Sequence, residues 1–224
     1  MAIKVIITGS TGMVGKGVLL ACIESKDVKS ILLINRKSVG IESEKVTEIL
    51  QKDFHNLSPL REMMTGYDAC YFCLGVSAFR MKEKEYNDIT YKTTLHLAKL
   101  LSDINPKMSF CYVSGAGTDS SEKGRSMWAR IKGKTENAIL KLPFKSTFMF
   151  RPGFILPLDG IKSKTPLYNT TYSIVKPFYP LIKWINPKGI TNTQDLGKAM
   201  INSTLVGYDK DIIYNKDINE LCLK

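Results

Sequence analysis

Two patterns of apolar residues alternate along most of the chain. Short runs that are apolar almost throughout are separated by longer stretches in which apolar residues recur every three or four positions. Continuous apolar runs are typical of strands covered on both faces, and the longer period is typical of amphipathic helices. The predicted strands are Ile3–Thr8, Ser30–Asn35, Val46–Gln51, Ala69–Leu74, Ser109–Val113 and Ser146–Phe150. The predicted helices are Met13–Ser25, Tyr86–Leu101, Arg125–Leu142 and Thr193–Leu205.

This alternation of strands and helices predicts an α/β fold built on a doubly wound parallel sheet. Residues 1–151 carry the repeating pattern and form the predicted core. From residue 152 onward, prolines and aromatic residues replace it up to about residue 190. We therefore expect residues 152–224 to form a small irregular cap region and a final helix within the same structural domain.

A glycine-rich turn follows the first strand and opens the first helix. Its sequence, TGSTGMVG, places glycines at 9, 12 and 15, in the pattern G-x-x-G-x-x-G. In this context Gly9 allows a tight turn, Gly12 allows backbone to approach a pyrophosphate, and Gly15 allows close packing of the helix. The start of the helix then offers free N–H donors to phosphate. The turn predicts an NAD(P)-binding Rossmann fold, with cofactor contacts from Gly9, Ser10, Thr11, Gly12, Met13, Val14 and Gly15.

The residues after the second strand indicate which dinucleotide is bound. An NAD site usually carries an acidic residue here, whereas this strand ends in Asn35, Arg36 and Lys37. A guanidinium can bind a 2′-phosphate with two hydrogen bonds, so we expect NADP rather than NAD. The alternative is an exposed basic turn with no ligand. Asp53 and Phe54, after the third strand, are expected to contact the adenine.

Together these motifs resemble the short-chain dehydrogenase/reductase superfamily. More narrowly, the chain is similar to its atypical members, the NAD-dependent epimerase/dehydratase-like proteins, including the Tat-interactive-protein subgroup. The resemblance covers most of the chain and rests on TGSTGMVG, the basic pair, Asp53-Phe54, Cys73-Leu74-Gly75, Asp88-x-x-Tyr91, YVSG (112–115), WARIKGKTE (128–136) and Arg151-Pro152-Gly153. It implies further cofactor contacts from Cys73, Leu74, Gly75, Lys132, Pro152 and Gly153.

The resemblance also implies a reaction centre made of a serine and a Tyr-x-x-x-Lys motif. Here Lys132 is retained, but Trp128 stands at the position of the tyrosine, and an indole cannot transfer a proton. Ser114 is the candidate serine, although another register places Gly115 there. We name Ser114, Lys132 and Trp128 as the candidate catalytic positions.

Two functions therefore stay open. The first is an NADP(H)-dependent oxidoreductase or epimerase acting on a small carbonyl or sugar-like substrate, with Tyr91 or Tyr112 as substitutes for the missing tyrosine. The second is a catalytically silent, NADP-sensing regulatory protein. A surface that binds nucleic acid or membrane is a third and weaker option.

The charge balance raises the question of anionic partners. The chain has 32 Lys and Arg against 21 Asp and Glu, a formal net charge of +11. The excess is spread along the chain, with no nucleic-acid motif and no apolar run near the ~18 residues of a membrane span. We therefore expect a small-molecule substrate and neither nucleic acid nor membrane as a partner. A homodimer through the long helices is left open.

The remaining candidate chemistry is sparse. Five cysteines and the absence of a leader-like pattern at the start favour a reduced, cytoplasmic compartment. Cys70 and Cys73 form a C-x-x-C pair, but they lie in a predicted strand, so we interpret them as buried structural cysteines. The two histidines, His55 and His96, lack metal-ligand spacing, and we expect no metal.

Overall fold

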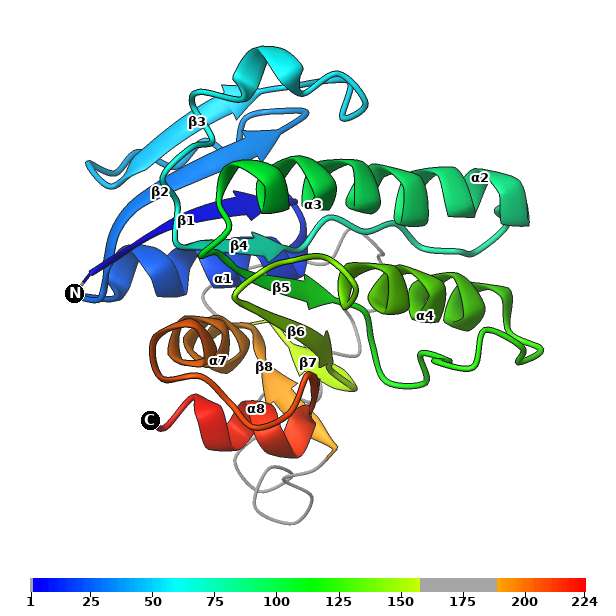
Figure 1. The fold of residues 1–224 in the computed structure, drawn as a ribbon. Helices are drawn as coiled ribbons and strands as arrows, with labels where there is room; N and C mark the ends of the chain where they lie inside the picture. The colour runs from blue at the N-terminus through cyan, green and yellow to red at the C-terminus, as the bar shows by residue number, and fades with distance from the viewer. Residues whose placement is uncertain (1, 158–188) are drawn as a thin grey trace.

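A seven-stranded parallel sheet forms the centre of the molecule in the computed structural model, which describes residues 2–157 and 189–224. The strand order is β3-β2-β1-β4-β5-β6-β9, and every pairing is parallel. The strands of this sheet are β1 (Ile3–Thr8), β2 (Val28–Asn35), β3 (Val46–Leu50), β4 (Ala69–Phe72), β5 (Ser109–Val113), β6 (Ser146–Arg151) and β9 (Ile212–Tyr214). The α/β class and the doubly wound parallel sheet are thus confirmed (Figure 1).

The four helices that the sequence predicts are present, and each end lies within three residues of the expected bound. The described helical segments are α1 (Met13–Glu24), η1 (Ser58–Leu60), α2 (Glu83–Asn87), η2 (Asp88–Lys92), α3 (Thr93–Ile104), α4 (Met127–Ile139), α7 (Thr193–Val206) and α8 (Asn215–Leu221). The single helix expected over Tyr86–Leu101 is in fact α2 and α3 joined through the π-helical turn η2.

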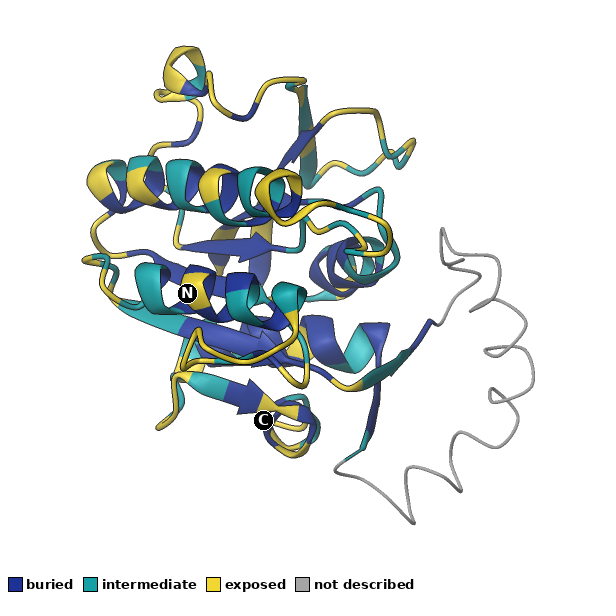
Figure 2. Ribbon diagram, turned by 90° about the vertical axis from the view of Figure 1, so that its right-hand side faces the viewer, coloured by how far each residue is buried: buried dark blue, intermediate teal, exposed yellow. Residues whose placement is uncertain are grey.

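Residues on the strands alternate between two cores, which explains why these strands are apolar throughout. Val5 and Ile7 of β1 pack into the core formed with α1 and α7, whereas Ile6 packs into the core formed with α3 and α4. Figure 2 shows the buried strands between helices whose outer faces are exposed. A residue period of two in a sheet covered on both sides favours apolar residues at the centres of the inner strands.

The C-terminal part contributes more regular structure than the sequence predicts. Strand β9 extends the main sheet beside β6, and β7 (Phe154–Leu156) pairs with β8 (Ile190–Asn192) in a small parallel sheet. These strands have three residues each, too few to show a period in the sequence. The expected irregular cap falls largely on residues 158–188, outside the described residues.

Helix α7 packs closely on α1 through glycines. A Cβ atom on Gly17 of α1 would lie 2.3 Å from the Thr193 Cβ, and one on Gly197 of α7 would lie 2.6 Å from the Ala21 Cβ. The absent side chains let the two backbones approach each other. Helix α7 is therefore part of the packing that supports the first helix.

Candidate functional site

Three loops meet where the strand order reverses, at the carboxyl ends of β2, β1 and β4. In open α/β sheets this crevice is the usual place for a ligand. A pocket of about 650 Å³ opens there. It is lined by Gly9, Thr11, Gly12, Ile34, Asn35, Arg36, Lys37, Ser38, Lys52, Phe54, Cys73, Leu74 and Gly75.

The glycine loop is shaped by contacts that no side chain could replace. Gly9 has a φ of +73°, and a Cβ there would lie 2.6 Å from the backbone nitrogen of Leu74. A Cβ on Gly15 would lie 2.3 Å from the carbonyl oxygen of Gly9. Gly15 thus lets the first turn of α1 pack on the glycine loop itself.

The start of α1 faces this loop with its backbone donors available. Gly12 is the N-cap residue and has no side chain to bond the N–H groups of the first turn. Its own N–H donates to the Gly9 carbonyl at 2.9 Å, which closes the turn. Uncapped N–H groups at a helix N-terminus bind anions. This part of the pocket fits the pyrophosphate of a dinucleotide.

Cations gather at the other end of the pocket. Arg36 and Lys37 line it after β2, and Lys52 lines it after β3. Within the described residues, none of the three forms an ion pair. Lys52 and Ser38 were missed by sequence reasoning, although the place of Lys52 just after a strand and beside Asp53 was a usable signal.

The residues around the expected adenine site divide into two groups. Phe54 is buried and lines the pocket, together with Leu74 and Cys73. Asp53 is not among the lining residues, and its carboxylate accepts a hydrogen bond from the backbone of His55 at 2.8 Å. Cys70 is buried as expected, whereas Cys73 is only partly buried and faces the pocket.

Some glycine-loop residues support the site without lining it. Ser10 is fully buried, and its hydroxyl accepts a hydrogen bond from the Asn35 amide at 2.7 Å. Met13 and Val14 begin α1 and are not among the lining residues either.

Ser114 and Lys132 meet beside the carboxyl end of β5. The Lys132 ammonium on α4 donates a hydrogen bond to the backbone carbonyl of Ser114. The Ser114 hydroxyl is buried and donates to the Phe150 carbonyl at 3.1 Å. The hydroxyl is therefore engaged within the sheet. Trp128 is partly buried beside Gly117, where a Cβ would lie 3.5 Å from the indole.

Burial changes the acidity of Lys132. It lowers the pKa of the ammonium to about 8, and the charge of Glu136, one helical turn later, opposes the shift. Glu136 is itself held by a buried ion pair with Arg151, the first residue of the Arg-Pro-Gly motif. The arrangement puts a titratable group near neutral pH at the end of β5.

The other residues named from the sequence lie around this centre. The Pro152 carbonyl accepts from Ala116 at 2.8 Å, and the Gly153 N–H donates to the Asn215 side chain at 3.0 Å. Tyr91 lies under the Lys134 ammonium, 4.4 Å from the ring centre. Tyr112 is fully buried in the core, and burial raises the pKa of its phenol.

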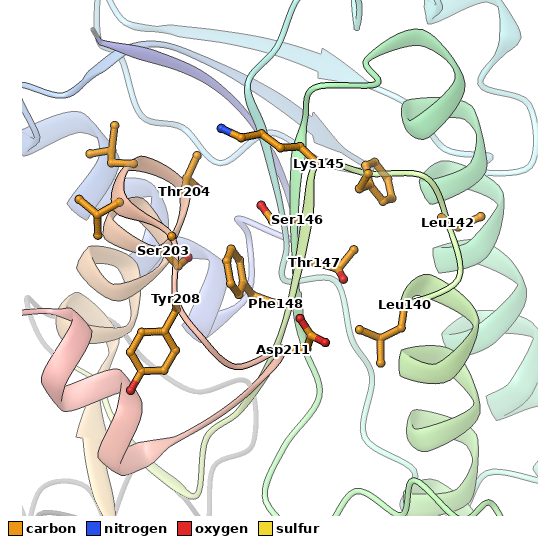
Figure 3. Close-up of a pocket in the computed structure, with 14 residues that line it drawn as sticks. Leu140, Leu142, Lys145, Ser146, Thr147, Phe148, Ser203, Thr204, Tyr208 and Asp211 are labelled. Carbon is orange, nitrogen blue, oxygen red and sulfur yellow. The ribbon is translucent and has the colours of Figure 1, made fainter.

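A second hollow lies at the opposite ends of the strands. It measures about 470 Å³ and lies between the end of α4, the start of β6 and the end of α7 (Figure 3). The hydroxyls of Ser203 and Thr204 donate hydrogen bonds to the Met200 carbonyl. The Ser146 hydroxyl forms a hydrogen bond with the Ser109 hydroxyl. The place of this hollow at the amino ends of the strands and its hydrogen-bonded hydroxyls set it apart from the pocket at the carboxyl ends.

Two further features are absent from the described part of the chain. No three His, Cys, Asp or Glu side chains gather there in a way that could hold a metal ion. No described helix combines the length and apolar character required to cross a bilayer.

Curated relatives align with about two thirds of the chain. A mitochondrial protein FMP52 from Meyerozyma guilliermondii is 28% identical over 154 residues, 68% of this chain and 65% of the relative. The protein HTATIP2 from Rattus norvegicus is 26% identical over 155 residues, 68% of this chain and 63% of the relative. The chain thus covers slightly less than two thirds of their length.

The names of these relatives correct one expectation. FMP52 proteins from M. guilliermondii, Debaryomyces hansenii and Emericella nidulans are all named mitochondrial. The expected cytoplasmic location is therefore contradicted. Composition and cysteine usage indicate a reducing compartment but do not distinguish the cytosol from the inside of an organelle.

Solved structures share the fold. A UDP-N-acetylglucosamine 4-epimerase from Methanobrevibacter ruminantium has a TM-score of 0.67 at 16% identity, covering 95% of this chain and 76% of that one. The enzyme WbmF from Bordetella bronchiseptica, in complex with NAD+, has a TM-score of 0.68 at 12% identity, covering 97% and 76%.

The sequence also matches a family model. Residues 5–125, which carry the glycine loop, the cations and strands β1 to β5, match the NAD dependent epimerase/dehydratase family. The match covers more than half of the 224 residues. The expected relation to the atypical short-chain dehydrogenases and reductases is confirmed, and the chain belongs to the NAD-dependent epimerase/dehydratase family.

Proposed function

We propose that this protein binds NADP(H) and acts as an oxidoreductase or epimerase on a small carbonyl or sugar-like substrate. The observation that carries the cofactor choice is the cluster of Arg36, Lys37 and Lys52 in the pocket lining, which contains no carboxylate among the described residues. A 2′-phosphate would add negative charge at this point, and unpaired cations favour it. WbmF was solved with NAD+, so this preference distinguishes the present chain.

Each part of the pocket has a separate task in this proposal. The N–H groups at the start of α1 bind the pyrophosphate, and Phe54 and Leu74 cover the adenine. Bound NADP(H) supplies or accepts a hydride. Lys132 binds the nicotinamide ribose, and residues 152–224 complete the substrate side of the same structural domain.

The proton needed at a substrate oxygen comes from Lys132 in this proposal. Trp128 cannot donate one, and the Ser114 hydroxyl donates to the Phe150 carbonyl instead. The lowered pKa of Lys132 gives its ammonium a proton that it can release near neutral pH.

The same two observations favour a second candidate, a catalytically silent protein that senses NADP(H). With an indole at position 128 and the Ser114 hydroxyl bonded to the Phe150 carbonyl, neither residue can transfer a proton to a substrate. The function is then to bind NADP(H) without turnover, and a partner binds selectively to the cofactor-bound form.

Titration of the full chain with NADPH, followed by fluorescence, tests both candidates. We expect a Kd in the micromolar range, and absence of binding would reject both. Turnover across a panel of carbonyl compounds then separates them. An enzyme loses turnover in Lys132→Met, whereas a silent protein shows none in the wild type and gains it only in Trp128→Tyr.

A further inference from the structure

An acidic side chain lies behind the loop that carries Arg36 and Lys37. Glu48 of β3 reaches this loop, and its Oε1 accepts from the Asn35 amide at 2.7 Å and from the Val39 N–H at 3.0 Å. Its Oε2 accepts from the Ser38 hydroxyl at 2.5 Å. The three donors precede and follow the two cations, so one carboxylate fixes both ends of the Arg36-Lys37 segment.

The same chain of hydrogen bonds reaches the glycine loop. The second proton of the Asn35 amide goes to the Ser10 hydroxyl at 2.7 Å, and both residues are buried. Because a carboxylate only accepts, Glu48 determines which way the Asn35 amide points. Among the described residues, the amide oxygen then has no hydrogen-bond donor, although it is buried and its residue lines the pocket.

Glu48 does not itself line the pocket. Although burial opposes ionisation, hydrogen bonds from Ser38, Asn35 and Val39 hold the pKa of Glu48 below its ordinary value. The carboxylate is therefore ionised at neutral pH, and its charge is directed at three donors. Through these hydrogen bonds Glu48 fixes the conformation of residues 35–39 without itself contacting a ligand.

We propose that Glu48 is a positioning residue for cofactor selectivity: it holds residues 35–39 so that Arg36 and Lys37 face the 2′-phosphate of NADP. The proposal rests on the NADP(H) binding proposed above. It assigns to a β3 carboxylate a role opposite to that of the β2 carboxylate in an NAD site, where the acid binds the ribose directly.

Two substitutions separate the effect of the length of the Glu48 side chain from the effect of its charge. Glu48→Gln keeps the length and the acceptor oxygen of the side chain but removes its charge, whereas Glu48→Asp keeps the charge but is one methylene shorter. Glu44→Gln is the matched control, since Glu44 is exposed, lies four residues earlier and, among the described residues, forms no hydrogen bond with residues 35–39. Thermal unfolding checks that each variant is folded.

The probes are adenosine 2′,5′-bisphosphate and 5′-AMP, which differ only in the 2′-phosphate, titrated into the full chain by calorimetry. We expect the wild type and Glu44→Gln to prefer the bisphosphate by about tenfold or more. Glu48→Gln should keep this preference within about threefold, and Glu48→Asp should lower it by about fivefold or more, with 5′-AMP affinity unchanged.

Four outcomes count against this inference. If Glu48→Asp keeps the full preference, or Glu48→Gln loses as much as Glu48→Asp, the carboxylate does not act by position. A loss of 5′-AMP binding in both variants would assign Glu48 to the ribose itself. If the wild type shows no preference, the NADP proposal fails before the role of Glu48 is reached.

Discussion

Arg151 and Glu136 form an ion pair that is almost closed to solvent, with side-chain exposures of 6% and 1%. The guanidinium also donates to the Ser120 hydroxyl at 2.5 Å and to the Tyr214 hydroxyl at 3.1 Å. One side chain thus links β6 to α4 and β9. The Arg151-Pro152-Gly153 motif therefore has a structural duty beside the candidate catalytic lysine.

Removing one partner of this ion pair should be costly. Arg151→Met leaves the Glu136 charge buried and unpaired, and we expect the free energy of unfolding to fall by about 3–5 kcal/mol. The double variant Arg151→Met, Glu136→Leu should lose less of the free energy of unfolding, because no buried charge is then left unpaired. Urea denaturation measures both. Arg61→Met, at the exposed pair with Asp103, should change stability by less than about 1 kcal/mol.

Reversing the charge at Arg36 should change cofactor preference. In Arg36→Asp we expect NADPH affinity to fall by about thirtyfold or more, since a charged hydrogen bond contributes about 2 kcal/mol and a repulsion replaces it. NADH affinity should change little. Fluorescence titration measures both, with Lys26→Asp, an exposed lysine before β2, as the control. Equal weakening of the two cofactors would contradict a 2′-phosphate contact.

A comparison of Gly9 with Gly66 separates the steric role of Gly9 from the cost of its left-handed backbone. Gly9 and Gly66 have φ values of +73° and +80°, but a Cβ meets Leu74 and Cys73 only at Gly9 and has open space at Gly66. Gly66→Ala should lose about 1–2 kcal/mol from the backbone alone and keep NADPH binding. Gly9→Ala should lose more stability and all measurable binding. Similar stability losses would mean that the turn adapts to the added carbon.

The pKa of Lys132 predicts two opposite responses to pH. Burial lowers it to about 8, against about 10.4 in an unfolded chain, so the unfolded state binds more protons between these values. The free energy of unfolding should therefore rise with pH across that window. Affinity for NADPH should fall as pH rises from about 7 to about 9, because the ammonium is lost.

Calorimetry and urea denaturation at several pH values test this pair of trends. In Lys132→Met both pH dependences should disappear over the same range. Lys134→Met, an exposed lysine on the same helix, should keep the wild-type profiles. A wild-type affinity that stays flat through about pH 8 would show that the ammonium does not contact the cofactor.

Much of the nucleotide-binding half could be predicted from local patterns. Apolar runs predict β1 to β6 because both faces of the sheet are covered, and the spacing of Gly9, Gly12 and Gly15 predicts the turn because backbone geometry demands glycine there. Glu48 could not be assigned in the same way. Its role depends on β3 lying beside β2, which is a property of tertiary structure.

The reaction centre was harder to predict. Trp128 and Lys132 are visible in the sequence, but the direction of the Ser114 hydroxyl depends on where β6 places the Phe150 carbonyl. Strands β7, β8 and β9 have only three residues each, and their pairing is decided by neighbours distant in the sequence. The boundary between residues 151 and 152 and the roles of the named site residues stay predictions.

The glycine contacts between α1 and α7 bear on how the chain acquires its function during synthesis. The helix that starts at the phosphate-binding turn emerges from the ribosome early, but the surface that covers its apolar side is encoded from Thr193 onward. Until then Val18 and Leu19 have no cover from α7. If the proposed cofactor binds there, we expect its capture to be a late event in synthesis. A premature stop ahead of α7 should then abolish binding even though every proposed cofactor-contacting loop had already been made.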